Sequence, residues 1–319
     1  MGQKQPSIVV VGSSNMDLVV KAPRIPIVGE TILGGDFLMT PGGKGANQAV
    51  AAAKLGADVY FVARLGNDIF AEHALANFAK ESIHTEYIIH TEDVSSGVAL
   101  ITVDGAGENV IVVAPGANGQ LSPGDVEKAR PAFVSSGAVV AQLEVPLETV
   151  ECAARLAEHS DVPFILDPAP AQKLSVQLLE MVDVLTPNET EARILTGMEV
   201  TDEDSARRAA GKLLALGVKT VILTMGAKGF MLCDSQKVEF IPALKVDAID
   251  TTAAGDAFTG ALAVGLARGR TLREAAVFAN YVAALSVMTM GAQSSMPSAE
   301  QVESFIKQRS VEGVNDAHV

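Results

Sequence analysis

The sequence predicts an α/β fold: a doubly wound, mostly parallel sheet flanked by helices, with a small separate β-sheet. The main observation is that short apolar, β-branched runs alternate with alanine-rich runs of helical length. Most of the short runs are apolar at consecutive positions, as in parallel strands that helices cover on both faces. Two other stretches carry strand-like patterns without neighbouring helices, and these predict the small sheet.

The strands expected in the main sheet are the short apolar runs at residues 8–12, 59–63, 138–143, 164–166, 184–186 and 220–224. The helices expected between and after them cover residues 46–55, 70–80, 147–158, 189–195, 205–216 and 257–267. Because strands alternate with helices, we expect right-handed crossovers between parallel strands. Residues 275–292 carry no charged side chain. Their many alanines and few polar residues indicate a helix buried in a large domain rather than a membrane span.

The small sheet is expected to come from two excursions out of the main fold, at about residues 18–37 and 97–114. The first has strand-like pieces separated by prolines and glycines. The second contains two apolar runs, 98–103 and 109–113, joined by a glycine-containing connection that indicates a hairpin. Such a sheet has one apolar face that needs a cover, from a substrate, a partner subunit or both. The sequence has no long linker, so residues 1–319 are expected to form one domain.

The charge balance argues against some classes of partner. The 319-residue chain has 24 Lys and Arg against 38 Asp and Glu, a formal net charge of −14. Nucleic acids and anionic membranes need clustered basic side chains, so neither is an expected partner. The two cysteines, Cys152 and Cys233, lie far apart and form neither a disulfide framework nor a metal-binding spacing. The start of the chain shows no signal-peptide pattern, and the expected location is the cytoplasm.

The first candidate site lies at residues 42–48, where three glycines precede an alanine-rich helix. Glycines let a backbone approach a ligand, the helix start offers free N–H groups, and Asn47 offers an amide. The same pattern also fits a tight loop before a helix. It is not a Walker loop, because Leu38 and Gly45 stand where that motif needs Gly and Ser or Thr. It is not a dinucleotide fingerprint either, because Gln48 stands where the third glycine belongs.

The second candidate site lies at residues 249–256, where small residues lead into the helix expected at 257–267. Free N–H groups at a helix start bind anions without Lys or Arg, so the acidic net charge does not argue against a phosphorylated ligand. Asp256 has two possible roles there. It either stabilises the helix start by about 0.5–1 kcal/mol or acts as a general base beside a phosphate pocket. The small residues before it favour the base, since nothing large shields the site.

Polar side chains near other predicted strand ends complete the candidates. Asn188 and Glu191 lie three residues apart at a helix start, where they either order waters on Mg²⁺ or form an ordinary N-cap. Asn15 and Asp17 follow the first strand, and Glu144 follows a later one. Ligands of open α/β sheets bind beyond the carboxyl ends of the strands. We therefore expect these last three side chains to contact the hydroxyls of a sugar.

Six segments together resemble the ribokinase family of sugar kinases, also called the pfkB carbohydrate kinases, over nearly the whole chain. These segments are residues 12–17, 42–48, 167–171, 186–191, 250–256 and 291–293. The resemblance implies the family's fold, with the small sheet as a lid that also forms a homodimer interface. It implies transfer of the γ-phosphoryl group of ATP to O5 of D-ribose, giving D-ribose 5-phosphate. The alternatives are a kinase for 2-deoxyribose, another sugar or a nucleoside, and a sugar or nucleotide sensor without catalysis.

The resemblance also implies roles for individual residues. Asp256 matches the catalytic base, and Ala253, Ala254 and Gly255 match the anion hole before it. The positions that match sugar contacts are Asn15, Met16, Asp17, Gly43, Lys44, Gly45, Ala46, Asn47, Glu144 and Asp256. The positions that match nucleotide contacts are Asn188, Thr224, Met225, Gly226, Ala227, Lys228, Gly229, Gly255 and Asn280. The positions that match cation sites are Asp250, Thr252, Ser286, Thr289, Gly291 and Ser295 for a monovalent activator, usually K⁺, and Glu191 for indirect contact with Mg²⁺.

Two positions depart from the family pattern. The anion-hole run often starts with Gly, and here it starts with Ala253, whose methyl group is expected to fit if the residue has a negative φ. Met16 stands where several family members carry Ala, which makes it a candidate for tuning the sugar pocket. The type of reaction is therefore more firmly implied than the identity of the pentose.

Overall fold

The main sheet has nine strands in the computed structural model, which describes residues 5–311. Across the sheet they lie in the order β13 (Val238–Pro242), β12 (Gly229–Asp234), β11 (Thr220–Thr224), β10 (Val184–Leu185), β9 (Phe164–Leu166), β8 (Ala138–Ala141), β1 (Ser7–Val11), β4 (Asp58–Gly66) and β5 (Ile88–Thr91). The strands from β11 to β5 are parallel, and β12 and β13 are antiparallel at one edge. The predicted parallel sheet is confirmed, whereas β5, β12 and β13 were not predicted.

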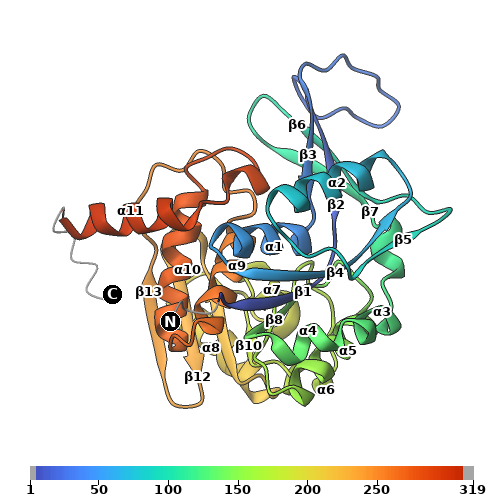
Figure 1. Ribbon diagram of the computed structural model, residues 1–319. Helices are drawn as coiled ribbons and strands as arrows, with labels where there is room; N and C mark the ends of the chain where they lie inside the picture. Colours follow the sequence, from blue (N-terminus) through green and yellow to red (C-terminus); the bar gives the residue numbers. More distant parts are fainter. Residues whose placement is uncertain (1–4, 312–319) are drawn as a thin grey trace.

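Helices cover both faces of this sheet, as expected for a doubly wound fold (Figure 1). One face carries α1 (Lys44–Lys54), α2 (Ile69–Lys80), α9 (Ala254–Ala267), α10 (Leu272–Ser286) and α11 (Ala299–Val311). The other carries α3 (Pro123–Lys128), α4 (Arg130–Ser135), α5 (Leu147–His159), α6 (Val176–Glu180), α7 (Glu189–Thr196) and α8 (Glu203–Ala215). Alternate residues of β1 enter the two cores: Ile8 and Val10 face the first layer, and Val9 and Val11 face the second.

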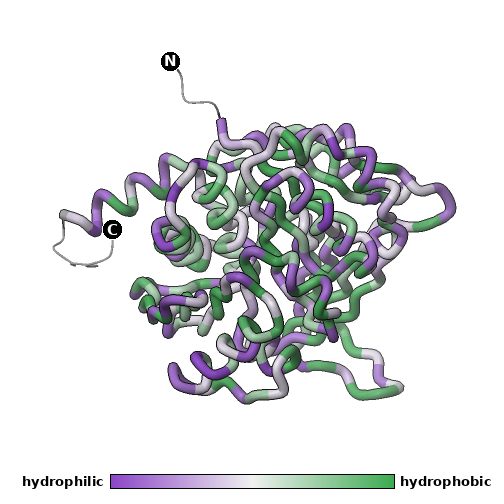
Figure 2. Tube along the Cα trace, turned by 90° about the horizontal axis from the view of Figure 1, so that it is seen from below, coloured by the Kyte–Doolittle hydropathy of each residue, from purple (hydrophilic) through white to green (hydrophobic). Residues whose placement is uncertain are grey.

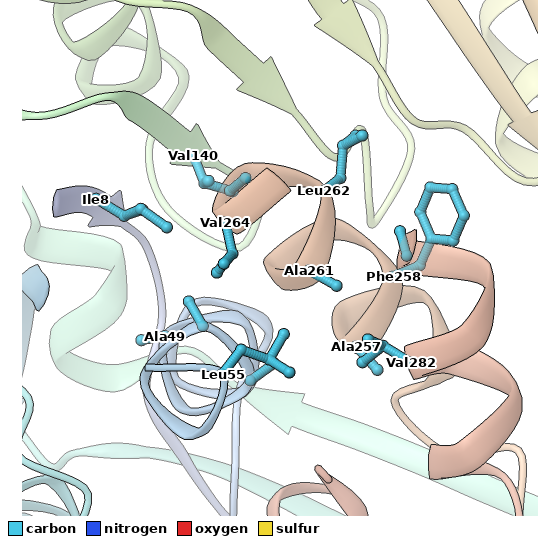
Figure 3. Close-up of a cluster of buried hydrophobic side chains, with 14 of the residues drawn as sticks. Ile8, Ala49, Leu55, Val140, Ala257, Phe258, Ala261, Leu262, Val264 and Val282 are labelled. Carbon is cyan, nitrogen blue, oxygen red and sulfur yellow. The ribbon is translucent and has the colours of Figure 1, made fainter. Parts of the chain in front are cut away.

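Helices α1 and α9 pack closely, and this contact brings their starts together. A side chain at Gly260 of α9 would place its Cβ 2.8 Å from the carbonyl oxygen of Gln48 in α1. Figure 3 shows Ala49 of α1, and Leu55 just after this helix, facing the small and branched side chains of α9. The glycine and the alanines therefore set a short distance between the helix axes.

The run at 275–292 is helical over only part of its length. Helix α10 ends at Ser286, and the chain turns at Gly291, whose φ is 96°. The expectation of a buried helix is therefore confirmed up to residue 286 and wrong beyond it. Within residues 5–311, none of the helices has both the length and the apolar character needed to cross a membrane. Figure 2 shows hydrophilic residues mixed with hydrophobic ones along the peripheral helices, α11 among them.

The second sheet has four strands that stand apart from the main sheet (Figure 1). Their order is β3 (Phe37–Gly42), β2 (Asn15–Lys21), β6 (Gly97–Val103) and β7 (Asn109–Ala114). These strands come from two separate parts of the chain, β2 and β3 from one and β6 and β7 from the other, and the predicted β6–β7 hairpin is present. The first excursion is wider than predicted. Its two strands, β2 and β3, lie on either side of residues 22–36, and those residues form the connection between them. We call this sheet the lid. The expectation of one domain over residues 1–319 stays a prediction, and residues 1–4 and 312–319 lie outside the described part.

Candidate active site

Three chain segments meet where the strand order reverses, between β1 and β8. Beyond the end of β1, Ser13 Oγ donates to Glu144 Oε2 at 2.5 Å, and Glu144 itself follows β8. The backbone N–H of Lys44, at the start of α1, donates to the same carboxylate oxygen at 3.0 Å. Ligands of open α/β folds bind at this kind of reversal point. Glu144 follows a strand of the main sheet, as the sequence indicates, and the structure places it beside the 42–48 segment.

The glycines of the 42–48 segment bring the chain close to itself. A Cβ at Gly43, whose φ is 88°, would lie 2.6 Å from the backbone N of Asn15. A Cβ at Gly45 would lie 2.6 Å from the backbone N of Ser13. Larger residues would therefore push the start of α1 away from the end of β1. At these two positions the close neighbour is the protein's own backbone rather than a ligand.

The first N–H groups of α1 are not free, which corrects the expectation for this helix start. Besides Lys44, the N–H of Gly45 donates to Ser13 Oγ at 3.3 Å, and that of Ala46 donates to Ser13 O at 2.8 Å. The N–H of Asn47 bonds within the helix region, to Gly43 O. Helix α1 therefore contributes its Lys44 and Asn47 side chains to the site instead of an anion-binding backbone.

The start of α9 is different, because part of its backbone is unpaired. Among the described residues, the N–H groups of Gly255 and Asp256 have no acceptor, whereas that of Ala254 bonds weakly to Thr251 O at 3.3 Å. A Cβ at Gly255 would meet nothing within 4 Å, so space is open there. Free N–H groups at the start of a 14-residue helix form a site for an anion.

The condition set for Ala253, a negative φ, is not met. Ala253 caps α9 with φ 59° and ψ 16°, the left-handed conformation that favours glycine. An L-residue with a Cβ there costs about 1–2 kcal/mol, and such strain often occurs at functional sites. The left-handed turn directs the next N–H groups out of the helix and into the cavity beside it.

Asp256 is buried and held by two amides from α1. Its Oδ2 accepts from Asn47 Nδ2 at 2.9 Å, and its Oδ1 accepts from Gln48 Nε2 at 2.9 Å. The Oδ1 atom of Asn47 is buried and has no partner among the described residues. An unpaired buried acceptor is costly, so it points to a donor that a ligand supplies. Asp256 and Asn47 therefore come together as the resemblance implies.

Two neighbouring cavities lie at the start of α9, and Asp256 lines the smaller one. The smaller, of about 180 Å³, is lined by Lys44, Asp256, the anion-hole residues and neighbouring polar groups. The larger, of about 660 Å³, has mostly apolar walls from α9, α10 and the loop after β13. Residues that line both cavities are Asn188, Thr224, Thr251, Ala254, Gly255 and Phe258. The shapes suit a polyphosphate next to a nucleoside.

Lys44 is the basic side chain in a group of carboxylates that line the smaller cavity. Burial alone would lower the pKa of Lys44, but the charges of Asp256, Asp167 and Glu144 outweigh burial and raise it above its usual value. Burial, reinforced by Asp256, raises the pKa of Asp167, and Lys44 opposes this shift. Burial also raises the pKa of Glu191. The smaller cavity thus holds more carboxyl groups than basic groups, and a bound metal cation would favour their ionised forms.

The sugar-contact candidates on β2 lie where the lid meets the main sheet. Asn15 Oδ1 accepts from Asn118 Nδ2 at 2.8 Å, and Asn118 comes from a short 3₁₀-helix at Gly116–Gln120. Burial, and then the charges of Glu144 and Asp256, raise the pKa of Asp17 to about 6. Met16 is buried, and strand alternation places its side chain on the face of β2 opposite to that of Asp17.

Residues 5–299 match the model of the pfkB family carbohydrate kinases. This chain belongs to that family. The carbohydrate kinase is 43% identical over 301 residues to the ribokinase of Haemophilus influenzae, covering 94% of this chain and 98% of the relative. It is 40% identical to the deoxyribokinase of Salmonella typhi, covering 94% and 98%. The structure of Arabidopsis thaliana ribokinase complexed with ribose and ATP matches with a TM-score of 0.90 and 34% identity, covering 95% and 99%. The predicted family and fold are confirmed.

The structure places most, but not all, of the nucleotide-contact candidates around the larger cavity. Those that line the larger cavity are Asn188, Thr224, Gly226, Ala227, Gly229, Gly255 and Asn280. Met225 lines neither cavity and lies in the core, 2% exposed. Lys228 also lines neither, and its Nζ donates to Thr201 O at 3.0 Å. For Met225 and Lys228 the structure therefore places the side chains away from the cavity.

Asn188 and Glu191 form a capping box at the start of α7. Asn188 Oδ1 accepts from the N–H of Glu191 at 2.9 Å, and Glu191 Oε2 accepts from the N–H of Asn188 at 2.8 Å. Both also line the smaller cavity, so the capping role and a ligand role are compatible. Carboxylate and amide oxygens are suitable ligands for hydrated Mg²⁺. Within residues 5–311, no group of three or more His, Cys, Asp or Glu side chains is arranged to hold a metal ion.

Three of the candidates for the monovalent-cation site, Asp250, Thr252 and Gly291, lie together. Asp250 Oδ1 accepts from Thr252 Oγ1 at 2.6 Å, and Asp250 Oδ2 accepts from the N–H of Gly291 at 2.8 Å. Burial alone would raise the pKa of Asp250, but these hydrogen bonds outweigh it and hold the pKa below its usual value. The N–H of Thr289 bonds to Ser286 O at 3.2 Å, and Ser295 Oγ bonds to Ala292 O at 2.8 Å. An ionised carboxylate beside hydroxyls and carbonyls fits K⁺ in donor type.

Several residues of the site were not predicted. Gln48 was noted only as a misfit to a motif, yet it contacts Asp256. Asp167 follows β9 and could have been found by the strand-end argument that found Glu144. Ser13 lies in the first matching segment but carried no assigned role. Asn118 reaches the site from an irregular connection, and no pattern in the sequence indicates that approach.

Proposed function

We propose that this carbohydrate kinase transfers the γ-phosphoryl group of ATP to O5 of D-ribose, with Asp256 as general base. The observation that carries this proposal is that Asp256 and the free N–H groups of residues 255 and 256 line one cavity. A base and an anion-binding backbone thus stand at the same place. Phosphoryl transfer needs positioning and electrostatic stabilisation more than covalent chemistry, and this arrangement supplies both.

Asp256 accepts the proton from the O5 hydroxyl of the sugar. The O5 atom then forms a bond to the γ-phosphorus, the bond from that phosphorus to the bridging oxygen breaks, and its electrons leave with ADP. The N–H groups of Gly255 and Asp256, together with the Lys44 ammonium, stabilise the charge on the transferring group. Asn47 holds one oxygen of the Asp256 carboxylate, so the base keeps its direction. A base of this kind contributes roughly 10²–10⁴-fold to the rate.

The sugar is placed by the polar groups between lid and main sheet, and the nucleotide by the larger cavity. We assign the sugar hydroxyls to Asn15, Asp17, Asn47 and Glu144. The unpaired Oδ1 of Asn47 supports this assignment, because a hydroxyl would satisfy it. The ATP base and ribose fit the cavity of about 660 Å³, with Asn280 on its wall. The similarity to the Haemophilus influenzae ribokinase and to the Arabidopsis thaliana ribokinase complexed with ribose and ATP supports these substrates.

Mg²⁺ accompanies the nucleotide in this proposal. Glu191 and Asn188 would hold its waters, and the carboxyl group of Asp167 lines the same cavity. When bound, the ion neutralises part of the charge on the phosphates. The excess of carboxylates over basic groups in the smaller cavity supports such a cation. We expect a chelator to abolish turnover and added Mg²⁺ to restore it.

K⁺ is proposed as an activator at the loop before α9. Asp250 and Thr252 come from that loop, and Gly291 comes from the turn after α10. A cation there would lie behind the anion hole, so it would add positive field and fix the loop that carries Ala253. The ionised Asp250 carboxylate supports a cation at this position.

We also propose a homodimer formed through the lid, working in the cytoplasm, where ATP is supplied. The lid face opposite to Asp17 is apolar and open, with Leu100 53% and Val112 60% exposed. These two residues are paired across β6 and β7, so they form one continuous surface. A second copy of the chain, with the same apolar face, would cover it.

A kinase for 2-deoxyribose is the second candidate. The observation that favours it is that a deoxyribokinase is 40% identical to this chain, close to the 43% of a ribokinase. The two sugars differ in a single hydroxyl, so a panel of ribose, 2-deoxyribose, other pentoses and nucleosides at fixed ATP tests the proposal. We expect the highest kcat/KM with ribose. A higher kcat/KM with 2-deoxyribose would favour the 2-deoxyribose kinase over the ribose kinase. Sugar binding without ADP release would indicate a sensor.

A further inference from the structure

A chain of buried polar side chains stands behind Asp256. Gln142 Nε2 donates to Gln48 Oε1 at 2.6 Å. Gln48 Nε2 donates to Asp256 Oδ1 at 2.9 Å and to Asp167 Oδ2 at 2.7 Å. Both glutamines are fully buried and line neither cavity. One amide group therefore bridges the base and a second carboxylate from behind the site.

The orientation of the Gln48 amide is determined by its neighbours. If the amide turned over, its oxygen would face two carboxylates and its NH₂ group would face the NH₂ group of Gln142. Three hydrogen bonds would become repulsive contacts. At the other end of this chain of contacts, Oε1 of Gln142 is buried and has no partner among residues 5–311, which costs free energy of folding. The chain keeps Gln142 in place although one of its own atoms stays unsatisfied.

The fold leaves space for this arrangement. A Cβ at Gly12 would lie 2.0 Å from Oε1 of Gln142, so any side chain there would displace the outer amide. Gly12 has no positive φ that would require glycine for conformational reasons. Glycine is therefore needed at position 12 because the Gln142 side chain and the start of α1 occupy the space that a Cβ would take.

Asp256 needs firm orientation to act as a base. The terminal torsion of an aspartate is broad, so an unrestrained carboxylate rotates readily. Here each oxygen has its own amide donor, Asn47 for Oδ2 and Gln48 for Oδ1. Gln48 is itself fastened at both ends, by Gln142 and by Asp167. The carboxylate plane is therefore determined in part by Gln48, which lines neither cavity.

We propose that Gln48 is a positioning residue for Asp256, with Gln142 and Asp167 as its two anchors. The proposal rests on the proposed function, in which Asp256 is the base. Gln48 acts on the rate through the direction of that carboxylate and leaves the binding of ATP and ribose unchanged. A misplacement of the order of 1 Å at a reacting group can cost about 100-fold in rate.

Methionine substitutions of the two glutamines test the proposal, since they keep the length of the side chain and remove the amide. We expect Gln48→Met to lower kcat about 10- to 100-fold with the KM values for ATP and ribose unchanged. Gln142→Met should lower kcat less, in the same direction. The double variant should lose no more than Gln48→Met alone, because both residues act through one chain of contacts.

The anchor at Asp167 is tested by a conservative pair. Asp167→Asn keeps an oxygen that accepts from Gln48 but removes a carboxyl group from the smaller cavity, so its kcat is compared with that of Asp167→Leu and should be the higher of the two. Asp167→Leu removes that acceptor and should lower kcat towards the value of Gln48→Met. A merely structural role would make the two variants differ in melting temperature without this difference in kcat.

Thr149→Val is the matched control for loss of a buried hydrogen bond. Thr149 is fully buried in the opposite helical layer and donates to Leu121 O at 2.5 Å. Its variant should melt at a lower temperature with normal kcat. If Gln48→Met does not fold, the proposal is tested with Gln142→Met and with the comparison of Asp167→Asn and Asp167→Leu.

Normal kcat in both glutamine variants would overturn the proposal, as would losses that multiply in the double variant or that come with raised KM. Asp256→Asn is measured beside them. Turnover by Asp256→Asn would show that the base itself is wrongly assigned. An inactive Asp256→Asn together with normal Gln48→Met and Gln142→Met would overturn the positioning role alone.

Discussion

Nδ2 of Asn47 lies 2.9 Å from Oδ2 of Asp256, a hydrogen bond between residues 209 positions apart. It joins the first turns of α1 and α9, two helix starts that the molecule uses in different ways. The N–H groups of α1 are saturated by Ser13 and Glu144, whereas those of Gly255 and Asp256 in α9 stay free. One helix start therefore builds the site, and the other is available to bind the phosphate.

The left-handed conformation of Ala253 predicts the effect of substitutions there. Ala253→Gly removes a strain of about 1–2 kcal/mol, and the extra freedom of glycine in the unfolded chain offsets about half of that gain. We expect the free energy of unfolding to stay equal or rise slightly. Ala253→Val should lower it by more than about 1 kcal/mol, because branched residues tolerate positive φ poorly. Urea unfolding measures the free energy of unfolding of both variants. A stable Ala253→Val variant together with a destabilised Ala253→Gly variant would contradict the claim that Ala253 is strained.

Asp17 predicts a pH-dependent stability. Burial raises its pKa from the ordinary value of 3.8 to about 6 in the folded chain, so the folded state holds the proton more tightly than the unfolded state. The group therefore costs stability above pH 6, and this cost disappears as the pH falls from 6 to 4. Asp17→Asn should be more stable than the parent at pH 8, by up to about 3 kcal/mol. The difference should vanish near pH 4.

Urea unfolding at pH 8, 6 and 4 checks this expectation, with Asp36→Asn on the exposed lid as the control. A stability difference between Asp17→Asn and the parent that stays the same at all three pH values would contradict it. The KM for ribose of the parent should also fall as the pH rises through 6, since a sugar hydroxyl donates to the ionised carboxylate.

Much of this arrangement could be predicted from sequence, for physical reasons. The parallel strands are short continuous apolar runs, and the lid hairpin has a glycine-containing turn, so both patterns are local. The role of Asp256 depends on small residues next to it in the chain. By contrast, Gln48, Gln142 and Asp167 meet only because three strand and helix ends converge, and no local pattern records that meeting. The positive φ of Ala253 likewise depends on the packing of α9 and not on its own side chain.

K⁺ activation is expected to depend on Asp250. With K⁺ in the buffer, turnover should exceed that in Na⁺ at the same ionic strength, because the smaller ion fits the oxygen ligands less well. Asp250→Asn should remove the difference, since the neutral amide attracts the cation less. Steady-state rates over a range of ATP concentrations measure this. Equal rates in the two salts for the parent would remove the proposed site.

The lid face of Leu100 and Val112 is expected to hold the dimer together. A lysine at either position places a charge in an apolar contact, so Leu100→Lys and Val112→Lys should give monomers in light scattering coupled to size exclusion. Val134→Lys is the control, because Val134 is 69% exposed on α4, away from the lid. A monomeric parent chain, or dimers that persist in both lid variants, would contradict the interface.

The measurement that tests the central assignment most directly is the turnover of Asp256→Asn beside its binding of ATP. The asparagine keeps the size of the side chain, and its oxygen can still accept from Asn47 or Gln48, but it cannot take the proton from O5. We expect kcat for ribose to fall by about 100-fold or more in a coupled ADP assay, with the affinity for ATP retained in calorimetry. Near-normal turnover in this variant would contradict the account.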